Sequence, residues 1–405
     1  MKKVKIIIGI LFVSALGNAQ GLQSYINEAQ ANNQNIQAYE VRYNIAQEKV
    51  NEANWLPNTE FGAGYFVSEP ETRTGAQVAR FSAKQMLPWF GTVSTRQKYA
   101  MAMAETDYVD YVVAKRKLAL SVTQSYYKLY SLKAKQGVLD KNIQLLKNYE
   151  SLALTSVEVG KASAVDVLRL QIRQNELQQQ KQILQEQFVA EQANFNGLLN
   201  RDTGLAIDVA QAVNIPENDP VIVDSLQLNP ELLRFDKMYE SVTQAELLNQ
   251  KEGSPMLGFG LDYVPVQERP DMTFSDNGKD IVMPMVSLSI PIFNKRYDSR
   301  TKQNELRKQE IEFQKQERLN FLESALAKAI SIRNEARIAF NTQAKNLGQA
   351  EDAEQILIKN YETGTIDFND VLDIQELQLK FQLNQIQSVQ LYYIQSALIN
   401  YLINK

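Results

Sequence analysis

The sequence of 405 residues contains no cysteine and no histidine. These residue types supply the thiol nucleophile, the commonest general base and two of the commonest metal ligands. Catalysis by carboxylates or by serine remains chemically possible, but no constellation of such residues stands out. We therefore expect the protein not to be an enzyme and to carry no cofactor or metal site. The formal net charge of −4 also argues against a general attraction to nucleic acid.

Long apolar runs are also scarce. The only clear one, at residues 6–15, follows three lysines and precedes Gly17-Asn18-Ala19, which offers the small residues that a signal peptidase reads. The run is too short to be a permanent membrane span, so we interpret residues 1–19 as a cleaved signal peptide. No cysteine is present to be lipidated at the new N-terminus. An exported chain without a membrane helix is periplasmic, secreted, or inserted in a membrane as strands.

Proline and glycine are confined to a few places, and long helices fill the rest. No proline occurs between residues 92 and 200 or after Pro291. We expect a helical hairpin over about 92–199 that turns at Gly160, and a second over about 294–403 that turns at Gly364. Ser163 with Asp166, and Asp367 with Asp370, have the spacing of capping boxes at the start of each return helix. A helix over 294–361 would be about 100 Å long, which indicates a rod.

Four short stretches alternate between apolar and small or polar residues, the period of a strand. They lie at about 59–68, 76–87, 256–265 and 281–290. Pro284 is a defect in the fourth, because proline cannot donate a ladder hydrogen bond. Shorter helices are expected at 21–55 and 229–252. The nine methionines are scattered along the sequence, so we expect no metal path from them.

The two halves of the chain repeat each other. Residues 160–171 align without gaps on residues 364–375, and Asp166-Val167-Leu168 then falls on Asp370-Val371-Leu372. Each half therefore has the order short helix, strand, loop, strand, long helix, turn, helix. We predict a first repeat over 20–200, a linker over 201–228 and a second repeat over 229–405.

The strands have the length that crosses a bilayer in a β-barrel, about 9–11 residues. Four strands cannot close a barrel, and open strand edges are not viable in lipid. Several copies of the chain are therefore expected to pool their strands into one barrel.

The repeated plan resembles the TolC-like outer-membrane factors, also called outer membrane efflux proteins. The segments that carry the resemblance are 361–365 (Tyr-Glu-Thr-Gly-Thr), 370–373 (Asp-Val-Leu-Asp) and 159–166. It implies a mainly α fold with a small β part: a homotrimer with a twelve-stranded barrel in outer-membrane lipid, continued by an α-helical barrel in the periplasm. Residues 85–91 are similar to the strand-to-helix junction of the heavy-metal efflux branch.

The resemblance also implies partners and site residues. An adaptor protein would meet the helix tips, and an inner-membrane transporter would deliver the substrate. The residues implied at the periplasmic pore gate are Asp370, Asp373, Tyr361 and Asp166. Those implied at the adaptor-contacting tips are Gly160, Gly364, Lys161 and Thr365, and those implied at the barrel interface are Trp89, Phe90 and Phe293.

Each site residue also has a plainer interpretation. Asp370 suits the first turn of a helix, where the helix dipole favours a carboxylate. Trp89 and Phe90 could form a buried cluster at a junction, and Tyr126, Tyr127 and Tyr130 could pack between helices. Ile366 stands where some family members have an arginine, so a salt bridge from that position to Asp166 is excluded.

The function that we expect is the exit duct of a tripartite efflux pump. The alternatives are the exit duct of a type I protein secretion system, a periplasmic adaptor, or an exported coiled-coil scaffold. An adaptor normally has one hairpin beside compact β domains, whereas two hairpins are predicted here. The sequence does not identify the cargo, the partner pump or the resting state of the gate.

Overall fold

The structure is a computed structural model that describes residues 13–160, 163–219, 226–271, 273–363, 365–366 and 368–404. The first twelve residues of the predicted signal peptide lie outside the described residues. So do Lys161, Gly364 and the predicted capping residue Asp367.

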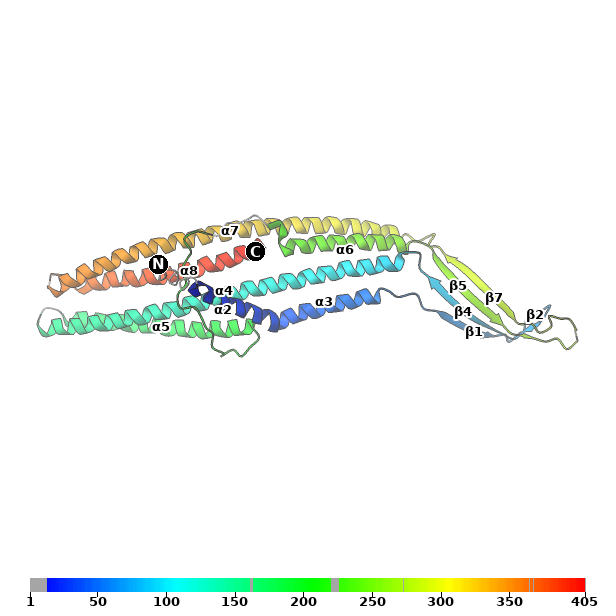
Figure 1. Ribbon diagram of the computed structural model, residues 1–405, viewed down its shortest axis with the longest axis horizontal. Coiled ribbons are helices and arrows are strands. Elements are labelled where there is room, and N and C mark those ends of the chain that lie inside the picture. Colours follow the sequence, from blue (N-terminus) through cyan, green and yellow to red (C-terminus); the bar gives the residue numbers. More distant parts are fainter. Residues whose placement is uncertain are drawn as a thin grey trace, which may run out of the picture. The chain divides into compact units, whose positions relative to one another are not determined.

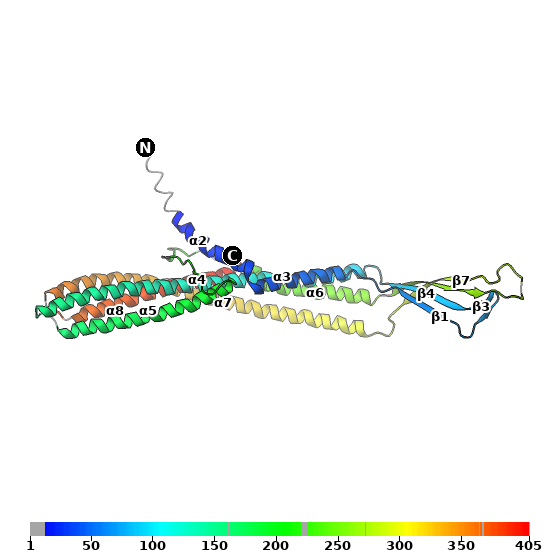
Figure 2. The ribbon, with the colours of Figure 1, turned by 90° about the horizontal axis from the view of Figure 1, so that it is seen from below.

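The two long hairpins predicted from the sequence are present and match in length. Helix α4 (Thr92–Glu158) and helix α7 (Arg296–Glu362) have 67 residues each, and helix α5 (Ala164–Leu198) and helix α8 (Phe368–Leu402) have 35 each. In Figures 1 and 2, α5 runs back along α4 and α8 runs back along α7. The internal repeat is thus a repeat of structure.

The first hairpin turns where the sequence predicts. Gly160 has φ +74°, a left-handed conformation that glycine adopts without steric cost. Ser163 then caps α5: its hydroxyl accepts a hydrogen bond from the backbone N–H of Val165, and its own N–H donates to Asp166 Oδ2 at 3.3 Å. This is the predicted capping box.

The helix predicted over 21–55 is two helices, α2 (Val13–Asn32) and α3 (Gln34–Glu52). Asn33 lies between them, and its Oδ1 accepts hydrogen bonds from the N–H groups of Asn35 and Ile36. A side chain that caps a new helix start competes with a continuous helix, which explains the break. Helix α6 (Pro230–Glu252) has nearly the predicted bounds, and a short 3₁₀ helix η1 (Leu226–Leu228) precedes it.

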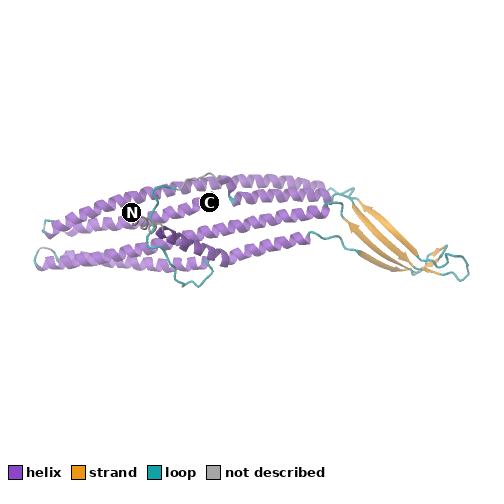
Figure 3. Ribbon diagram, viewed as in Figure 1, coloured by secondary structure: helices purple, strands orange, loops and turns teal. Residues whose placement is uncertain are grey.

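The strands form one main sheet and one small sheet (Figure 3). The main sheet has the order β1-β4-β5-β7 and is antiparallel throughout, with strands β1 (Glu60–Tyr65), β4 (Ala79–Leu87), β5 (Met256–Val264) and β7 (Ile281–Ser289). The small sheet, which the sequence did not predict, joins β2 (Glu71–Thr72), β3 (Gly75–Gln77) and β6 (Val266–Gln267).

Pro284 does not interrupt the fourth strand. Strand β7 pairs with β5 along its whole length, with Pro284 opposite Leu261. Within the described chain β7 is an edge strand, where a proline is tolerated because its missing N–H need not serve a second neighbour.

The chain divides into two compact units, which combine parts of both repeats. The first unit contains Met1–Tyr39, Tyr111–Pro230 and Arg318–Lys405, and the second contains Glu40–Asp110 and Glu231–Glu317. The first holds the hairpin tips, the linker and the main apolar core clusters. The second holds both sheets. Among the described residues, no helix carries an apolar stretch long enough to cross a membrane.

Candidate functional site

The main sheet has two chemically different faces. Residues paired across antiparallel strands point to the same side, so the register assigns every side chain to a face. One face is apolar and exposed to solvent in the isolated chain: Phe61 is 82 % exposed and Val286 is 74 % exposed. The apolar face consists of Phe61, Ala63, Tyr65, Ala79, Phe81, Ala83, Gln85, Leu87, Leu257, Phe259, Leu261, Tyr263, Val282, Pro284, Val286 and Leu288.

The opposite face, which we call the polar face, carries charges, hydroxyls and glycines. Arg80 on β4 forms an ion pair with Asp262 on β5, and the Asp262 side chain is fully buried. The other members of this face include Glu60, Gly62, Gly64, Ser82, Lys84, Gly258, Gly260, Ser287 and Ser289. A sheet that exposes a wide apolar face opposite a polar one fits a boundary between lipid and water better than a protein core.

Two strand edges of the main sheet have no partner within the described chain. Strand β1 pairs only with β4, and β7 pairs only with β5. Because the four strands alternate in direction, β7 of one copy would run antiparallel to β1 of another copy. The directions of the two edge strands therefore permit an identical sheet to continue this one in the same antiparallel pattern.

Aromatic residues cluster at the junctions between strands and helices. Trp89 is 36 % exposed, Phe90 75 % and Phe293 98 %, so the alternative of a buried junction cluster is wrong for the chain by itself. Trp89 and Phe90 contact each other edge to face with ring centroids 5.7 Å apart. Sequence reasoning missed Trp55, which is also exposed and lies under the Arg96 guanidinium at 4.1 Å. The sequence did hold a signal for Trp55, because both tryptophans of the chain lie next to predicted strands.

In the first unit, the tips of the two hairpins meet around one aromatic cluster. The rings of Tyr361 on α7 and Phe368 on α8 lie 4.8 Å apart, and Phe368 packs edge-on against Tyr149 of α4 at 5.8 Å. Tyr361 and Asp166 are both 7 % exposed. The Asp166 carboxylate accepts the N–H of Ser163 in the capping box of α5. It therefore has a partner, although position 366 carries isoleucine and not the arginine of some family members.

The two carboxylates predicted at the gate lie on the other side of α8. Asp370 and Asp373 are exposed. Val371, which lies between them in the sequence, and Phe368, which precedes them, are buried. Thr365 is exposed as well, and its hydroxyl donates to the carbonyl of Asn360. The structure thus buries Tyr361 in the tip cluster and Asp166 in its capping box, and it leaves Asp370 and Asp373 exposed to solvent.

Buried polar contacts tie the hairpins together above this cluster. Tyr149 on α4 donates to Glu354 Oε1 on α7, and Gln378 on α8 donates to Glu354 Oε2 at 2.9 Å. Burial, together with this hydrogen bond to a carboxylate, raises the pKa of Tyr149 far above its usual range. Gln375 on α8 donates to Asn142 Oδ1 on α4 at 2.6 Å. None of these contacts was predicted.

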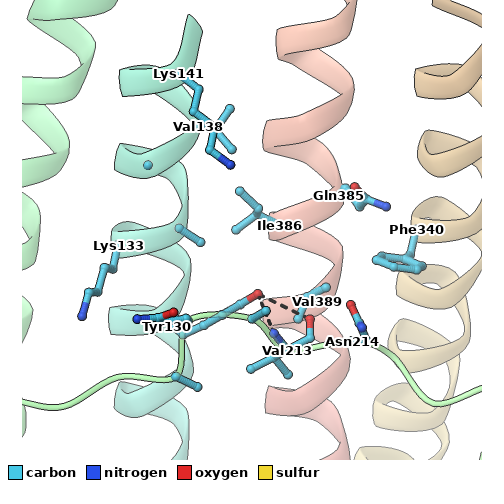
Figure 4. A pocket seen from close by; sticks show the side chains of 15 residues that line it. Tyr130, Lys133, Val138, Lys141, Val213, Asn214, Phe340, Gln385, Ile386 and Val389 are labelled. Carbon is cyan, nitrogen blue, oxygen red and sulfur yellow. Dashed lines mark hydrogen bonds between the residues drawn. The ribbon is translucent and has the colours of Figure 1, made fainter. Parts of the chain in front are cut away.

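Tyrosines that the sequence analysis interpreted as helix packing also hold the linker. The hydroxyl of Tyr130 accepts a hydrogen bond from the N–H of Val213 at 3.3 Å, and that of Tyr126 accepts from the N–H of Ala210 at 3.1 Å. On α8, Tyr393 donates to the carbonyl of Asn214. Figure 4 shows Tyr130 reaching Val213 at the base of a cavity of about 410 Å³ between α4, α8 and the linker.

Two arginines hold the linker at Asp219. Arg337 on α7 donates to Asp219 Oδ1 at 2.6 Å, and Tyr392 on α8 donates to the same oxygen at 2.7 Å. Arg333 adds a second cation 3.7 Å from Asp219 Oδ2. Burial and the bond to Asp219 raise the pKa of Tyr392 to about 12. The linker is therefore fastened to α4, α7 and α8 within the first unit.

The described chain thus combines an antiparallel sheet that has one exposed apolar face and two open edges with two long helical hairpins. Residues 25–201 match the model of the family described as "Outer membrane efflux protein". No curated protein matches the sequence.

Solved structures match almost the whole chain. The channel CusC has a TM-score of 0.76 at 13 % identity, over 95 % of this chain and 92 % of that one. VceC from Vibrio cholerae gives 0.74 at 16 %, over 95 % and 96 %. The open state of the Neisseria gonorrhoeae MtrE channel gives 0.73 at 13 %, over 95 % and 88 %. At these identities the likeness establishes the fold.

The family match over the first repeat and the shared fold confirm the predicted resemblance of the chain to the TolC-like outer membrane efflux proteins. This is a family of channel proteins rather than of enzymes. The description of the matched family names the outer membrane, in agreement with the location predicted from the sequence.

Proposed function

We propose that the chain is the exit duct of a tripartite efflux pump. Three copies join their sheets, β7 to β1, into a twelve-stranded barrel in the outer membrane. Their hairpins form a hollow helical barrel in the periplasm. A periplasmic adaptor docks on the hairpin tips, and an inner-membrane transporter delivers the substrate.

The observation that carries this proposal is the two-faced sheet with open edges. Its apolar face would contact lipid, and its polar face would contact water in the pore. Open edges in lipid would leave backbone groups unpaired, at a cost of several kcal/mol for each group. Three copies of an alternating four-stranded sheet remove every edge while keeping all pairs antiparallel.

The predicted site residues take roles in this assembly. Asp370 and Asp373, exposed on α8, would line the constricted end as carboxylate rings that favour cations. Tyr361 and Asp166, buried at the tips, would hold that end closed. Gly160, Lys161, Gly364 and Thr365 would meet the adaptor. Trp89, Phe90 and Phe293, joined by Trp55, would form an aromatic girdle at one membrane interface.

The absence of native cysteine makes the assembly directly testable. We would introduce Ala63→Cys on β1 together with, in turn, Val282→Cys, Pro284→Cys or Val286→Cys on β7. Oxidation of the membrane-embedded protein should give a covalent trimer for at least one combination, because each copy offers both edges. The trimer should collapse to monomer on reduction.

The matched control places the second cysteine on an inner strand. Ala63→Cys with Leu261→Cys on β5 should give no intermolecular product, because β5 is flanked by β4 and β7 of its own chain. Recovery of the protein as a soluble monomer, or cross-linking that does not depend on the strand chosen, would refute the proposal.

A further inference from the structure

The end of the main sheet that joins the helices carries exposed aromatic side chains. Trp89 and Phe90 lie in the connection from β4 to α4, and both are exposed. Trp55 lies at the same junction, because Arg96 of α4 stacks on its ring and donates to its backbone carbonyl at 3.1 Å. Figures 1 and 2 show that α4 begins and α6 ends at this end of the sheet. Polar groups here would meet the headgroups of a bilayer whose interior contacts the apolar face.

Gly91 follows these aromatic residues and leaves a space beside the first turn of α4. It has φ +82°, and the position that a Cβ would take there is 3.8 Å from Lys251 Nζ, at the end of α6, and 4.0 Å from Ser94 Oγ. An ammonium group and a hydroxyl group therefore approach one point from two helices. The N-terminus of α4 adds the partial positive charge of its unpaired backbone N–H groups. The space beside Gly91 therefore favours an anion.

Lys251 also lines a cavity of about 410 Å³ between α4 and α6. Thr95 and Lys98 line the same cavity from the side of α4. Among the described residues that line it, no side chain is a carboxylate. The acidic residue next to Lys251 is turned toward α7, where Glu252 pairs with Arg300 at 3.0 Å. The two lysines therefore give the cavity a net positive charge.

Two polar atoms at this cavity and beside it have no hydrogen-bond partner among the described residues. Gln244 lines the cavity, and its Oε1 is buried without a donor. Thr92 comes three positions before Thr95, on the same side of α4, and its hydroxyl is also buried and unpartnered. A buried polar atom without a partner costs stability. A ligand with hydrogen-bonding groups of its own is therefore favoured over a bare ion.

We propose that Lys98 and Lys251, together with the first turn of α4, bind the phosphate of an anionic phospholipid headgroup such as phosphatidylglycerol. The lysines complement the charge of the lipid, and the exposed aromatic residues next to them face its acyl chains. The glycerol hydroxyls of this headgroup supply the donor that Gln244 Oε1 lacks. The position of the site at a membrane surface rests on the proposed function.

Tryptophan fluorescence tests this proposal, because Trp55 and Trp89, the two tryptophans of the chain, both lie at this junction. The full chain is reconstituted in vesicles that contain phosphatidylglycerol or phosphatidylcholine brominated in the acyl chains, since bromine quenches nearby tryptophan. The affinity for phosphatidylglycerol should be about fivefold higher, the factor that one lysine near a membrane surface adds for an anionic lipid. The double variant Lys98→Gln with Lys251→Gln should lower this ratio to about one.

The matched control is Lys328→Gln with Lys345→Gln, which removes two exposed lysines of α7 that belong to the first unit and should keep the preference. Native mass spectrometry of the full chain in detergent supplies a second measurement. It should show one phosphatidylglycerol retained per wild-type chain and none in the Lys98/Lys251 variant. An excess of inorganic phosphate should not displace the lipid, because free phosphate lacks the contacts of the acyl chains.

Equal quenching by the two lipids in the wild type, or an unchanged preference in the Lys98/Lys251 variant, would overturn the proposal. Complete displacement by inorganic phosphate would show that the site takes a free anion, and would overturn the assignment to a lipid. Trimer formation, measured by the cross-linking of β1 to β7, separates the two proposals. A monomer that retains phosphatidylglycerol keeps the site and refutes the duct, whereas a trimer that retains none refutes only the site.

Discussion

Arg337 and Asp219 form a direct ion pair of 2.6 Å that fastens the linker to helix α7. Burial alone would raise the pKa of Asp219, but the hydrogen bonds from Arg337 and Tyr392 and the nearby cations outweigh it and lower this pKa. A carboxyl group with a lowered folded pKa stabilises the fold above its unfolded pKa of about 3.9. That contribution is lost as the pH falls through the folded value.

The first prediction follows from this ion pair. Asp219→Asn should loosen the linker at pH 7, with a local loss of about 2 kcal/mol, because hydrogen bonds to charged groups are worth about 1.5–3 kcal/mol. Limited proteolysis between residues 201 and 219 measures the effect. The wild type should become equally sensitive only when the pH is well below 4. Asp208→Asn, an exposed change in the same linker, is the control and should behave as wild type.

The second prediction concerns the contact between Tyr149 and Glu354. The raised pKa keeps Tyr149 protonated at neutral pH, so it acts as the donor to the carboxylate. Tyr149→Phe should speed hydrogen exchange in the first turns of α8 about tenfold, corresponding to a loss of about 1.4 kcal/mol. The exposed neighbour Glu351→Gln should not change exchange there. An unchanged exchange rate in Tyr149→Phe would show that the contact does not restrain α8.

The third prediction compares two glycines with opposite expected signs. Gly160 has a positive φ, and a Cβ added there would meet no neighbouring atom. Gly160→Ala should therefore lose only the stability that the strained backbone conformation costs, about 1 kcal/mol. Gly348 lies in the middle of α7, also with open space, and Gly348→Ala should add about 0.5–1 kcal/mol. Thermal unfolding of both variants measures the difference. Equal shifts in the two would contradict the assigned turn.

The fourth prediction tests the two faces of the sheet with adjacent residues of β1. Phe61→Lys places a charge on the apolar face, at a cost of about 2–4 kcal/mol if that face contacts the middle of the bilayer. Glu60→Lys places the same charge on the polar face and should be tolerated. The amount of protein in the outer-membrane fraction measures both. Similar yields would mean that the apolar face does not contact lipid.

The fifth prediction addresses the proposed carboxylate rings. Asp370→Asn with Asp373→Asn should reduce the block of single-channel current by polyvalent cations, because the negative charge that attracts the blocker is removed. Asp352→Asn, an exposed change on α7, should leave the block unchanged. If the double variant is blocked as strongly as wild type, these carboxylates do not line the pore.

The helices and strands were largely predictable because local signals set them. The absence of proline, the turn at Gly160 and the box of Ser163 and Asp166 give the bounds of α4 and α5 almost to the residue. The break at Asn33 was missed because the apolar stripe continues across it and a single asparagine is a weak signal. The division of the predicted second strand, 76–87, into β3 and β4 depends on pairing with β6, which is remote in sequence.

The candidate sites were less predictable because they depend on contacts between distant residues. Tyr130 and Val213 are 83 positions apart, and no periodicity connects a helix with an irregular linker. The ion pair between Arg80 on β4 and Asp262 on β5 likewise depends on the strand register. Family resemblance supplied the gate residues, and the structure adds that Asp166 is occupied in a cap while Asp370 and Asp373 are exposed.

Pro284 lies near the centre of β7, and a proline has no amide hydrogen. On an edge strand that position offers nothing to an incoming strand, so a foreign peptide laid along the whole border leaves one of its own carbonyls unsatisfied, at about 1–3 kcal/mol. Strand β1 of a second copy would meet the same missing donor, so the β7–β1 junction of the proposed trimer would hold one backbone hydrogen bond fewer than a full ladder.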